Sequence, residues 1–333
     1  MNASDQVLHQ AVLSIENLKV SLPSDGRPLQ PVRGVSLEVR AGRTLCIVGE
    51  SGCGKSMTAM GIMKLLPESA SISADRIDLA GQDLSKLDEK QFRELRGDRI
   101  AMIFQDPMTC LNPVLTVGEQ MTEVYLRHRR ATKAQARTRA IELLEQVGVT
   151  SANRRLAQYP HELSGGLRQR VMIAIALMCD PKVLIADEPT TALDVTVQLQ
   201  ILRLLREIQQ RTGLAIVLIT HDLGVVAHVA HDVVVMYAGE IVERGTLQSV
   251  FANPLHPYTR GLMDCIPVPG KIERGSKLNS IPGLVPSLRE LIVGCGFRQR
   301  CRFAREACSD PVALREVQEG RWVRCILEEQ DLS

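Results

Sequence analysis

Short apolar runs alternate with amphipathic stretches along most of the chain. Four runs are apolar over most of their length and end in polar residues, at 43–50, 99–106, 182–188 and 214–222. Such runs are typical of strands in a parallel sheet that is covered on both faces. The stretch 55–66 has helical spacing and stops at Pro67, which predicts a strand, a turn and a helix from residue 43 onward.

A second pattern lies between the strand predicted at 99–106 and the strand predicted at 182–188. It has helical periodicity at 116–130, 133–149 and 167–178, which predicts a helical subdomain over about 107–180, inserted into an α/β core. After residue 245 prolines become frequent and the alternation of strands and helices is lost. We therefore expect one domain over 1–250 and a small second domain over 251–333.

Composition narrows the possible partners and the compartment. The 333 residues include 40 Lys and Arg against 38 Asp and Glu, so a net charge of +2 gives no global attraction to nucleic acid or an anionic membrane. Aromatic residues make up only 3%, which also disfavours binding of single-stranded nucleic acid. The N-terminal twenty residues lack the features of a signal peptide, and the longest apolar run, 171–179, is about half a membrane span. We expect a cytosolic chain, so a partner would have to cross any membrane involved.

The sequence GESGCGKS, Gly49–Ser56, fits the phosphate-loop pattern G-x-x-x-x-G-K-[ST]. Glycines let successive backbone N–H groups surround phosphates, the lysine reaches the β and γ phosphates, and the serine hydroxyl can bind magnesium. The helix that follows adds the positive end of its dipole. A glycine-rich turn without nucleotide is the alternative, but the strand before the motif and the helix after it are the context that favours a phosphate loop.

The run VLIADEP delivers Asp187 and Glu188 to the carboxyl end of a predicted buried strand. Ligands of open parallel sheets bind at that edge. Asp187 would hold magnesium and Glu188 would polarise the attacking water. A pair of solvated loop carboxylates is the alternative reading.

The sequence LSGGLRQR, 163–170, places Ser164, Gly165 and Gly166 at the start of a predicted amphipathic helix. A serine and two glycines at a helix N-terminus form a backbone cradle for an anion. Taken alone, this motif is more typical of an ordinary helix N-cap. With the phosphate loop, however, the chain carries two candidate phosphate cradles.

Five motifs together resemble one family. GESGCGKS, Gln105 in IFQDP, LSGGLRQR, LIADEPTTALD and His221 in LITHD occur in the order and spacing of the nucleotide-binding subunits of ABC transporters. The wording of MIFQDPMTCLNP and NPLHPYTRGLM further resembles bacterial dipeptide and oligopeptide importer ATPases, a group that includes nickel importers. The resemblance implies an α/β P-loop ABC ATPase core with an antiparallel β segment at its start.

The resemblance also implies roles for individual residues. Glu188 is the expected general base, His221 contacts the γ phosphate, and Gln105 senses the γ phosphate, contributes to the magnesium site and couples to a transmembrane partner. Magnesium is expected at Ser56, Gln105 and Asp187. The residues expected to bind ATP are Gly49, Glu50, Ser51, Gly52, Cys53, Gly54, Lys55, Ser56, Met57, Gln105, Ser164, Gly165, Gly166 and Asp187.

The same resemblance implies an assembly. Two ATPase subunits, copies or related chains, close head to tail, so that Ser164–Gly166 face the γ phosphate held by the other subunit and Asp194 lies at the interface. Two membrane permease subunits and an extracytoplasmic solute-binding protein complete an importer, with the ATPase peripheral on the cytoplasmic face of the inner membrane. Peptides are the expected solute. The alternatives are nickel or another solute, an ABC ATPase acting on nucleic acid, and a regulatory protein that binds nucleotide without turnover.

Two positions depart from the pattern of the family. Leu22 stands where an aromatic ring usually stacks on adenine, and Cys53 replaces the more frequent serine of the phosphate loop. A thiol beside Lys55 and a helix N-terminus predicts a lowered pKa and high reactivity for Cys53, whereas an inert small side chain is the alternative.

Four of the nine cysteines gather in the C-terminal region, at Cys295, Cys301, Cys308 and Cys325. Four thiolates are a complete ligand set for a [4Fe-4S] cluster or for structural zinc. Gaps of five, six and sixteen residues are wider than the tight pairs of many zinc sites and favour the larger cluster. We expect the cluster in a structural role, with zinc or free thiols as the alternatives.

Overall fold

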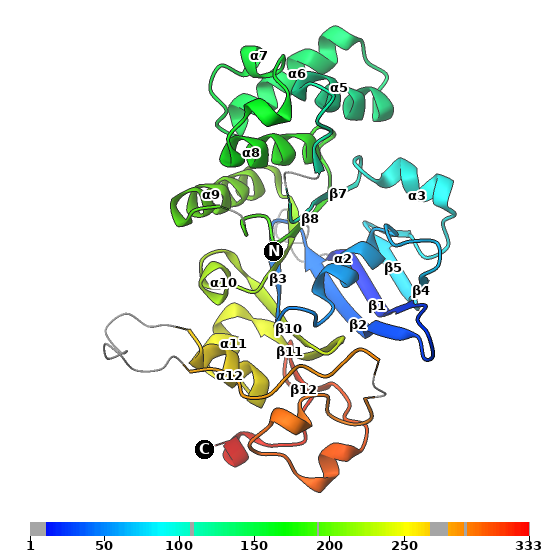
Figure 1. Cartoon of the computed structure of the whole chain (residues 1–333), viewed down its shortest axis with the longest axis vertical. Helices are drawn as coiled ribbons and strands as arrows, with labels where there is room; N and C mark the ends of the chain where they lie inside the picture. The colour runs from blue at the N-terminus through cyan, green and yellow to red at the C-terminus, as the bar shows by residue number, and fades with distance from the viewer. Residues whose placement is uncertain (1–10, 107–109, 192, 267–278, 290–291, 333) are drawn as a thin grey trace, which may run out of the picture. The chain divides into compact units, whose positions relative to one another are not determined.

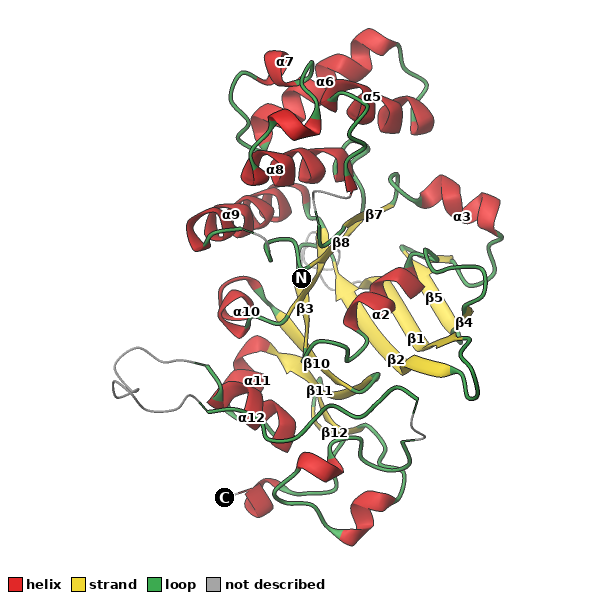
Figure 2. Cartoon of the chain, viewed as in Figure 1, coloured by secondary structure: helices red, strands yellow, loops and turns green. Residues whose placement is uncertain are grey.

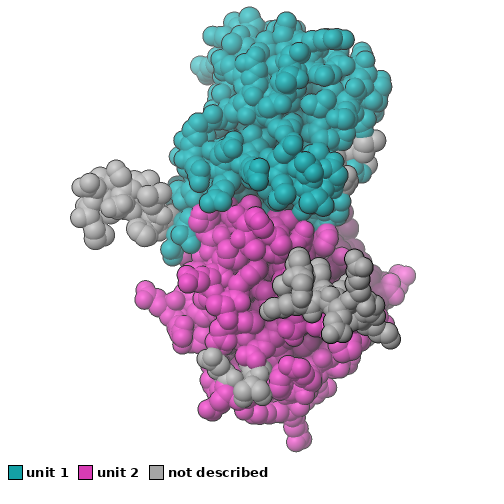
Figure 3. Space-filling view, turned by 90° about the vertical axis from the view of Figure 1, so that its left-hand side faces the viewer, with its two compact units in different colours: residues 1–13, 39–43, 78–219 teal, residues 14–38, 44–77, 220–333 magenta. Residues whose placement is uncertain are grey.

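The computed structural model describes residues 11–106, 110–191, 193–266, 279–289 and 292–332. It divides into two compact units, coloured separately in Figure 3. Unit 1 comprises residues 1–13, 39–43 and 78–219, and unit 2 comprises residues 14–38, 44–77 and 220–333. This division follows packing within the chain, and the domain boundary expected near residue 250 stays a prediction.

Unit 2 begins with the predicted antiparallel β segment. Strand β1 (Ala11–Leu22) neighbours β2 (Leu29–Arg40) and pairs antiparallel with β4 (Ser71–Ser73), with Val20 opposite Ile72. Buried and more exposed positions alternate along much of β1, as expected for a sheet with one face on a core. In unit 1, Asp78 and Leu79 of β5 (Arg76–Leu79) pair antiparallel with Asp83 and Gln82 of β6 (Gln82–Asp83).

Five further strands of unit 2 neighbour one another in the order β12-β13-β11-β10-β3, and Figure 1 labels β3, β10, β11 and β12. β3 runs parallel to β10, and the other neighbours are antiparallel. All five residues of β3 are buried, which confirms the apolar strand predicted at 43–50. The strands are β3 (Thr44–Val48), β10 (Asp232–Tyr237), β11 (Glu240–Thr246), β12 (Arg315–Gln318) and β13 (Arg321–Val323).

The helices of unit 2 are short. They are α2 (Lys55–Ile62), α10 (Leu223–Val229), α11 (Leu247–Ala252) and α12 (Pro257–Asp264), with 3₁₀ turns η2 (Arg298–Arg300), η3 (Glu306–Ser309) and η4 (Glu329–Leu332). The C-terminal stretch therefore has little regular structure, yet β13 lies beside β11 and extends the sheet.

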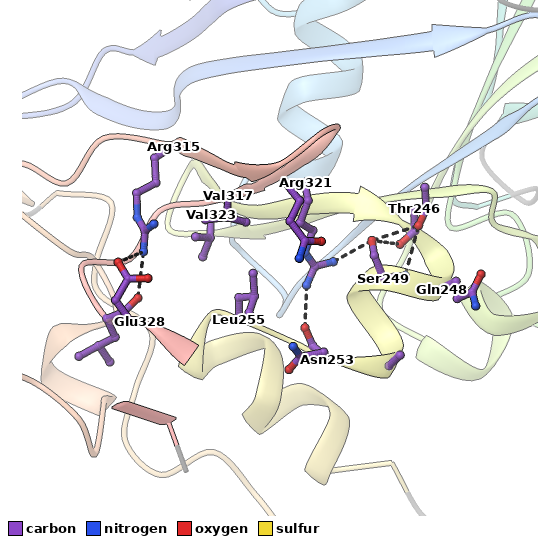
Figure 4. Close-up of a pocket in the computed structure, with 13 residues that line it drawn as sticks. Thr246, Gln248, Ser249, Asn253, Leu255, Arg315, Val317, Arg321, Val323 and Glu328 are labelled. Carbon is purple, nitrogen blue, oxygen red and sulfur yellow. Dashed lines mark hydrogen bonds and ion pairs between the residues drawn. The ribbon is translucent and has the colours of Figure 1, made fainter. Parts of the chain in front are cut away.

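The turn of the β12–β13 hairpin is anchored by Arg321 beside a cavity of about 470 Å³ (Figure 4). Arg321 is 4% exposed, and its guanidinium bonds to the carboxylate of Glu243 at 2.5 Å, to the Ser249 hydroxyl at 3.1 Å and to the Asn253 carbonyl at 2.9 Å. Burial raises the pKa of Glu243, which opposes the effect of this arginine.

Unit 1 contains three parallel strands in the order β9-β8-β7. They are β7 (Ile100–Ile103), β8 (Val183–Asp187) and β9 (Ala215–Thr220), and every residue of β8 and β9 is buried. The three apolar runs predicted as strands at 99–106, 182–188 and 214–222 are thereby confirmed.

The helices of unit 1 include the predicted helical group. They are α3 (Glu89–Leu95), α5 (Val117–His128), α6 (Lys133–Gln146), α7 (Ala152–Arg155), α8 (Gly165–Ala176) and α9 (Val195–Thr212), with the 3₁₀ turn η1 (Pro160–Glu162). Figure 2 shows α5 to α8 gathered without a strand among them. Thr116 and Thr132 start α5 and α6 with capping boxes, in which each threonine accepts the amide N–H three residues ahead.

Helix α2 is shorter than its sequence pattern predicts. We expected it over 55–66, but it ends at Ile62 because Lys64 takes a left-handed backbone conformation with φ 49°. The amide of Leu65 then donates to the carbonyl of Met60 at 2.9 Å, which closes the helix end as a Schellman motif. Hydrophobic spacing continued past this stop, so the sequence did not reveal it.

In the stretches of chain that the structure describes, no helix combines the length and apolarity needed to cross a membrane.

Candidate nucleotide-binding site

The phosphate loop connects β3 to α2 in unit 2, and its backbone conformation requires glycine. Gly49 and Gly54 have φ values of 153° and 102°. A Cβ atom on Gly49 would stand 2.3 Å from the carbonyl oxygen of Met236, and one on Gly54 would stand 2.1 Å from that of Pro31. Any side chain at either position would therefore have to displace a backbone carbonyl.

Lys55 occupies the interior of this loop. Its side chain is largely buried, with 5% of the residue exposed, and Nζ donates to the carbonyl oxygens of Gly49 at 2.8 Å and Glu50 at 3.1 Å. The ammonium group is thus held at the centre of the loop by groups that a phosphate oxygen could replace. Ser56 and Met57 follow in the first turn of α2, whose backbone amides favour an anion.

Cys53 corrects one expectation. Its side chain is fully buried, and burial raises the pKa of the thiol even though Lys55 Nζ lies 3.9 Å from Sγ. Removal from water destabilises the thiolate more than the nearby ammonium group stabilises it. The lowered pKa predicted for Cys53 is therefore wrong, and the raised pKa favours the alternative of an inert small side chain.

The carboxylate pair lies where the strand pattern predicts, at the end of β8 in unit 1. Asp187 is the last residue of the strand and is 5% exposed. Glu188 has a left-handed backbone with φ 44°, held by its N–H bond to the carbonyl of Ile219 at 2.9 Å. Such conformations cost about 1–3 kcal/mol in a non-glycine residue and concentrate at functional sites.

Gln105 and Glu188, which were each expected in the ATP site, are in contact. Gln105 Nε2 donates to Glu188 Oε2 at 2.9 Å, and the Thr191 hydroxyl donates to the same oxygen at 2.8 Å. Two donors on one oxygen orient the carboxylate and stabilise its ionised form, which a general base requires. Thr191 was not expected in this role, although it lies in the quoted motif.

Ser164 begins α8 as its N-cap, and its hydroxyl accepts the Leu167 N–H at 3.4 Å. Ser164 and Gly165 are exposed, and a Cβ on Gly165 would meet Leu193 only at 3.7 Å. Asp194, the residue after Leu193, caps α9: its carboxylate accepts the Val197 amide N–H at 2.9 Å. Ser164 and Gly165 therefore lie beside Leu193 and Asp194 on unit 1.

The remaining expected positions divide between the units. Unit 2 holds Gly49–Met57 and His221, which is exposed just after β9, whereas unit 1 holds Gln105, Ser164–Gly166, Asp187 and Glu188. Leu22 is half-buried at the end of β1, so its assignment near adenine stays a prediction.

The four C-terminal cysteines influence one another. Burial raises the pKa of Cys295 to about 11, and the other three thiols add to this effect. Backbone amides oppose it, those of Phe297 at Cys295, Phe303 at Cys301 and Leu327 at Cys325. Among the residues described here, however, no group of three or more His, Cys, Asp or Glu is arranged so that it could hold a metal ion.

Sequence reasoning missed the contacts between the phosphate loop and the C-terminal half of unit 2. The Glu50 amide donates to the Tyr258 hydroxyl at 2.8 Å, and Arg300 binds the Glu50 carboxylate. The scarcity of aromatic residues was a usable signal, because Tyr237, Tyr258 and Phe297 meet with ring centroids 4.6–5.4 Å apart.

Comparisons with known proteins agree with this geometry. Residues 32–191 match the sequence family described as ABC transporter, and residues 242–308 match the oligopeptide/dipeptide transporter C-terminal region. The probable peptide ABC transporter ATP-binding protein y4tR of Sinorhizobium fredii is 50% identical over 94% of both chains. The dipeptide transport ATP-binding protein DppD of Bacillus subtilis is 48% identical over 96% of both chains.

Solved structures show the same fold. The ATP-binding cassette MJ0796, in a dimeric post-hydrolysis state bound to ADP and Pi, superposes with a TM-score of 0.63 at 27% identity, over 71% of this chain and 98% of that chain. The fold and the site thus define an ABC-type ATPase. The chain belongs to the family of ABC transporter ATP-binding subunits whose members carry the oligopeptide/dipeptide transporter C-terminal region.

Proposed function

We propose that this chain hydrolyses ATP to power import of peptides through a membrane ABC transporter. The observation that carries the proposal is similarity over nearly the whole chain to ATP-binding proteins of peptide transport, including the C-terminal region at 242–308. Nickel import by the same group is the second candidate solute class. Since solute contacts belong to other subunits, the residues of this chain bear on the ATP reaction alone.

The proposed chemistry assigns one task to each group. The loop amides and Lys55 bind the phosphates, and Ser56, Gln105 and Asp187 supply the oxygen donors that Mg²⁺ prefers. Glu188 accepts the proton of the attacking water while Gln105 and Thr191 hold its carboxylate. His221 contacts the γ phosphate from its exposed position after β9.

A second ATPase subunit completes the proposed site. Ser164, Gly165 and Asp194 are exposed on unit 1, which is consistent with a cradle that acts on nucleotide held by another subunit. A relative at 28% identity is described as a dimeric ABC transporter cassette. Whether the partner is a copy of this chain or a related one is decided by which chains purify together.

A cavity lined by Phe104, the residue before Gln105 in the chain, supports a permease partner. It has a volume of about 300 Å³ and a mainly apolar lining that includes Phe104, Leu111 and Leu115. Phe104 is 39% exposed, so its ring is available to another chain. We place the ATPase at the cytoplasmic face of the membrane, bound to two permease subunits that a solute-binding protein supplies.

Reconstitution of the purified complex tests the function and the solute together. The ATPase, its permease and its solute-binding protein are placed in liposomes, and ATP turnover is measured with di- and oligopeptides, with a nickel chelate and with DNA. Stimulation by peptides alone is the expected result. Stimulation by nickel alone would transfer the chain to the second candidate, and stimulation by DNA without permease would contradict transport.

We also propose that Cys295, Cys301, Cys308 and Cys325 hold a [4Fe-4S] cluster. The other three thiols raise the pKa of Cys295, which is consistent with four thiols that share one site. The gaps of five, six and sixteen residues between them favour a cluster over the tight pairs of many zinc sites. Amide N–H groups at three of the sulfurs would stabilise thiolates around a larger anionic cluster. A bound cluster would fix this stretch of little regular structure.

Anaerobic purification tests the cluster independently of ATP turnover. We expect a brown protein with about four irons and four sulfides per chain. Alanine at Cys308 should remove the colour and expose the C-terminal region to proteolysis, whereas alanine at Cys110, an exposed cysteine of unit 1, should leave both unchanged. Stoichiometric zinc, or no metal at all, would overturn this assignment.

A further inference from the structure

The phosphate loop carries an acidic residue whose charge is cancelled from the C-terminal half of unit 2. Arg300 Nη1 and Nη2 contact the two carboxylate oxygens of Glu50 at 2.6 and 3.0 Å. The side chain of Arg300 is 4% exposed and that of Glu50 is 29% exposed. A two-pronged, mostly buried arginine–carboxylate pair of this kind has a fixed geometry.

All five N–H groups of Arg300 have acceptors. Besides Glu50, they donate to the Tyr237 hydroxyl at 3.3 Å, to the Ile281 carbonyl at 3.1 Å and to the Pro282 carbonyl at 2.9 Å. Because every N–H group of the guanidinium is used, these hydrogen bonds fix its position and orientation. The arginine therefore acts as a rigid brace for Glu50.

The main chain of Glu50 is held from the same side. Its amide donates to the Tyr258 hydroxyl at 2.8 Å, and Tyr258 is fully buried against Tyr237 and Phe297. The Glu50 carbonyl in turn accepts from Lys55 Nζ at 3.1 Å. A displacement of Glu50 would therefore move an acceptor of the lysine that is expected to bind phosphate.

The pairing of Arg300 with Glu50 changes the net charge of the loop that ATP is expected to approach. ATP brings several negative charges to this loop, and an uncancelled carboxylate in the same loop would repel them. Arg300 removes that repulsion because it neutralises Glu50 at close range. It also lies next to Cys301, so the same arginine connects the phosphate loop to the cysteine-bearing stretch.

We propose that Arg300 is a positioning residue for ATP binding, which cancels the charge of Glu50 and braces the phosphate loop from the C-terminal region. This inference rests on ATP binding at Gly49–Met57 and holds whether or not the cysteines carry a cluster. It adds to the established reaction a residue about 250 positions from the loop in sequence.

Second-site rescue tests the proposal on the full-length chain in its assembled complex. ATP and ADP affinities are measured by displacement of a fluorescent ATP analogue from the parent, Arg300→Met, Glu50→Gln and the double variant. Arg300→Met should weaken ATP binding about tenfold or more, and ADP binding less, because ADP has one charge fewer. Glu50→Gln leaves the arginine charge uncancelled and should tighten ATP binding.

The double variant separates charge cancellation from a simple packing role. With neither charge present, ATP affinity should return to within about threefold of the parent. A merely structural arginine would not be rescued, so a double variant as weak as Arg300→Met would overturn the proposal, as would an unchanged ATP affinity in Arg300→Met. Arg305→Met is the matched control, because Arg305 is exposed and pairs with Asp331, and its ATP affinity should equal that of the parent.

The double variant also carries the test if Arg300→Met alone does not fold. It should then fold and bind ATP within about threefold of the parent, since the half-buried carboxylate left without Arg300 is gone. A folded double variant that binds ATP about tenfold more weakly would overturn the proposal. Reconstitution failure with peptides would leave these affinities intact, so the two claims fail separately.

Discussion

In unit 2 the phosphate loop has its lysine buried and its glycines pressed against backbone carbonyls, whereas in unit 1 Gln105, Ser164 and Gly165 are exposed. The loop is completed within its own unit by contacts from Pro31, Met236 and the C-terminal half. In unit 1, Gln105 bonds to Glu188, Ser164 accepts the Leu167 amide, and Gly165 has room around it. We expect changes in the loop to damage folding, and changes in unit 1 to damage the reaction while the fold remains.

The largest effect should come from the catalytic side of this comparison. Glu188→Gln keeps size and can still accept the Gln105 bond, but it loses basicity, so ATP turnover should fall about 10²- to 10⁴-fold. ATP should still bind, and the closed ATPase dimer should accumulate. Single-turnover phosphate release in the assembled complex measures the effect. Glu142→Gln, an exposed glutamate on α6, is the control, and parent-like turnover in Glu188→Gln would remove Glu188 as the base.

A matched pair of glycine substitutions tests the comparison directly. Gly54→Ala forces a side chain into a left-handed backbone and against the Pro31 carbonyl, so the free energy of unfolding should fall by about 3 kcal/mol or more. Denaturant unfolding of the purified chain measures this loss. A loss below about 1 kcal/mol would mean that the loop is less constrained than its contacts indicate.

Gly165→Ala is the other member of the pair. The new methyl group meets Leu193 at an ordinary contact distance of 3.7 Å, so the free energy of unfolding should stay within about 0.5 kcal/mol of the parent. ATP-driven dimerisation should nevertheless weaken, because the methyl group stands where phosphate would approach. If stability fell as far as in Gly54→Ala, the contrast between the two cradles would not hold.

His256 offers a pH-dependent test of the support behind the loop. It is 1% exposed, its Nδ1 accepts the Tyr258 amide at 3.1 Å, and burial lowers its pKa to about 3. Between about pH 6.5 and pH 3, His256 is therefore protonated in the unfolded chain but not in the folded chain. Stability should be full above about pH 6.5 and fall by up to about 1.4 kcal/mol per pH unit below it.

Comparison with His256→Asn isolates that contribution. Asparagine can accept the Tyr258 amide as a helix N-cap but does not titrate, so the unfolding free energy should depend less steeply on pH between 6.5 and 4. Thermal unfolding across that range measures both slopes. Identical slopes would show that His256 does not report on the packing behind the loop.

The smallest effect concerns the buried thiol. Cys53 is fully buried with a raised pKa, so iodoacetamide at neutral pH should label it much more slowly than the exposed Cys110. Peptide mass spectrometry after timed labelling gives both rates. Equal rates would indicate that the loop opens often enough to expose Cys53 without nucleotide.

Most of the site could be predicted from short local sequence patterns. The phosphate loop, the carboxylates after β8 and the serine that caps α8 each depend on a few consecutive residues, so their spacing sufficed to find them. Burial and long-range pairing were not visible in the same way. The pKa of Cys53 depends on atoms packed around it from elsewhere, and the pair of Glu50 with Arg300 joins residues 250 positions apart. No short motif records either fact.

The buried carboxylate of Glu243 affects when this part of the chain can fold during synthesis. It is completely buried, accepts the amides of Leu255 and His256, and pairs with Arg321, which lies 78 residues later in the chain. On a ribosome the acid leaves the exit tunnel well before the base. Burying it alone would cost several kcal/mol. We therefore expect this part of the sheet to stay unfolded in the nascent chain until residue 321 has left the ribosome. A pause in synthesis before that point would prolong the unfolded state.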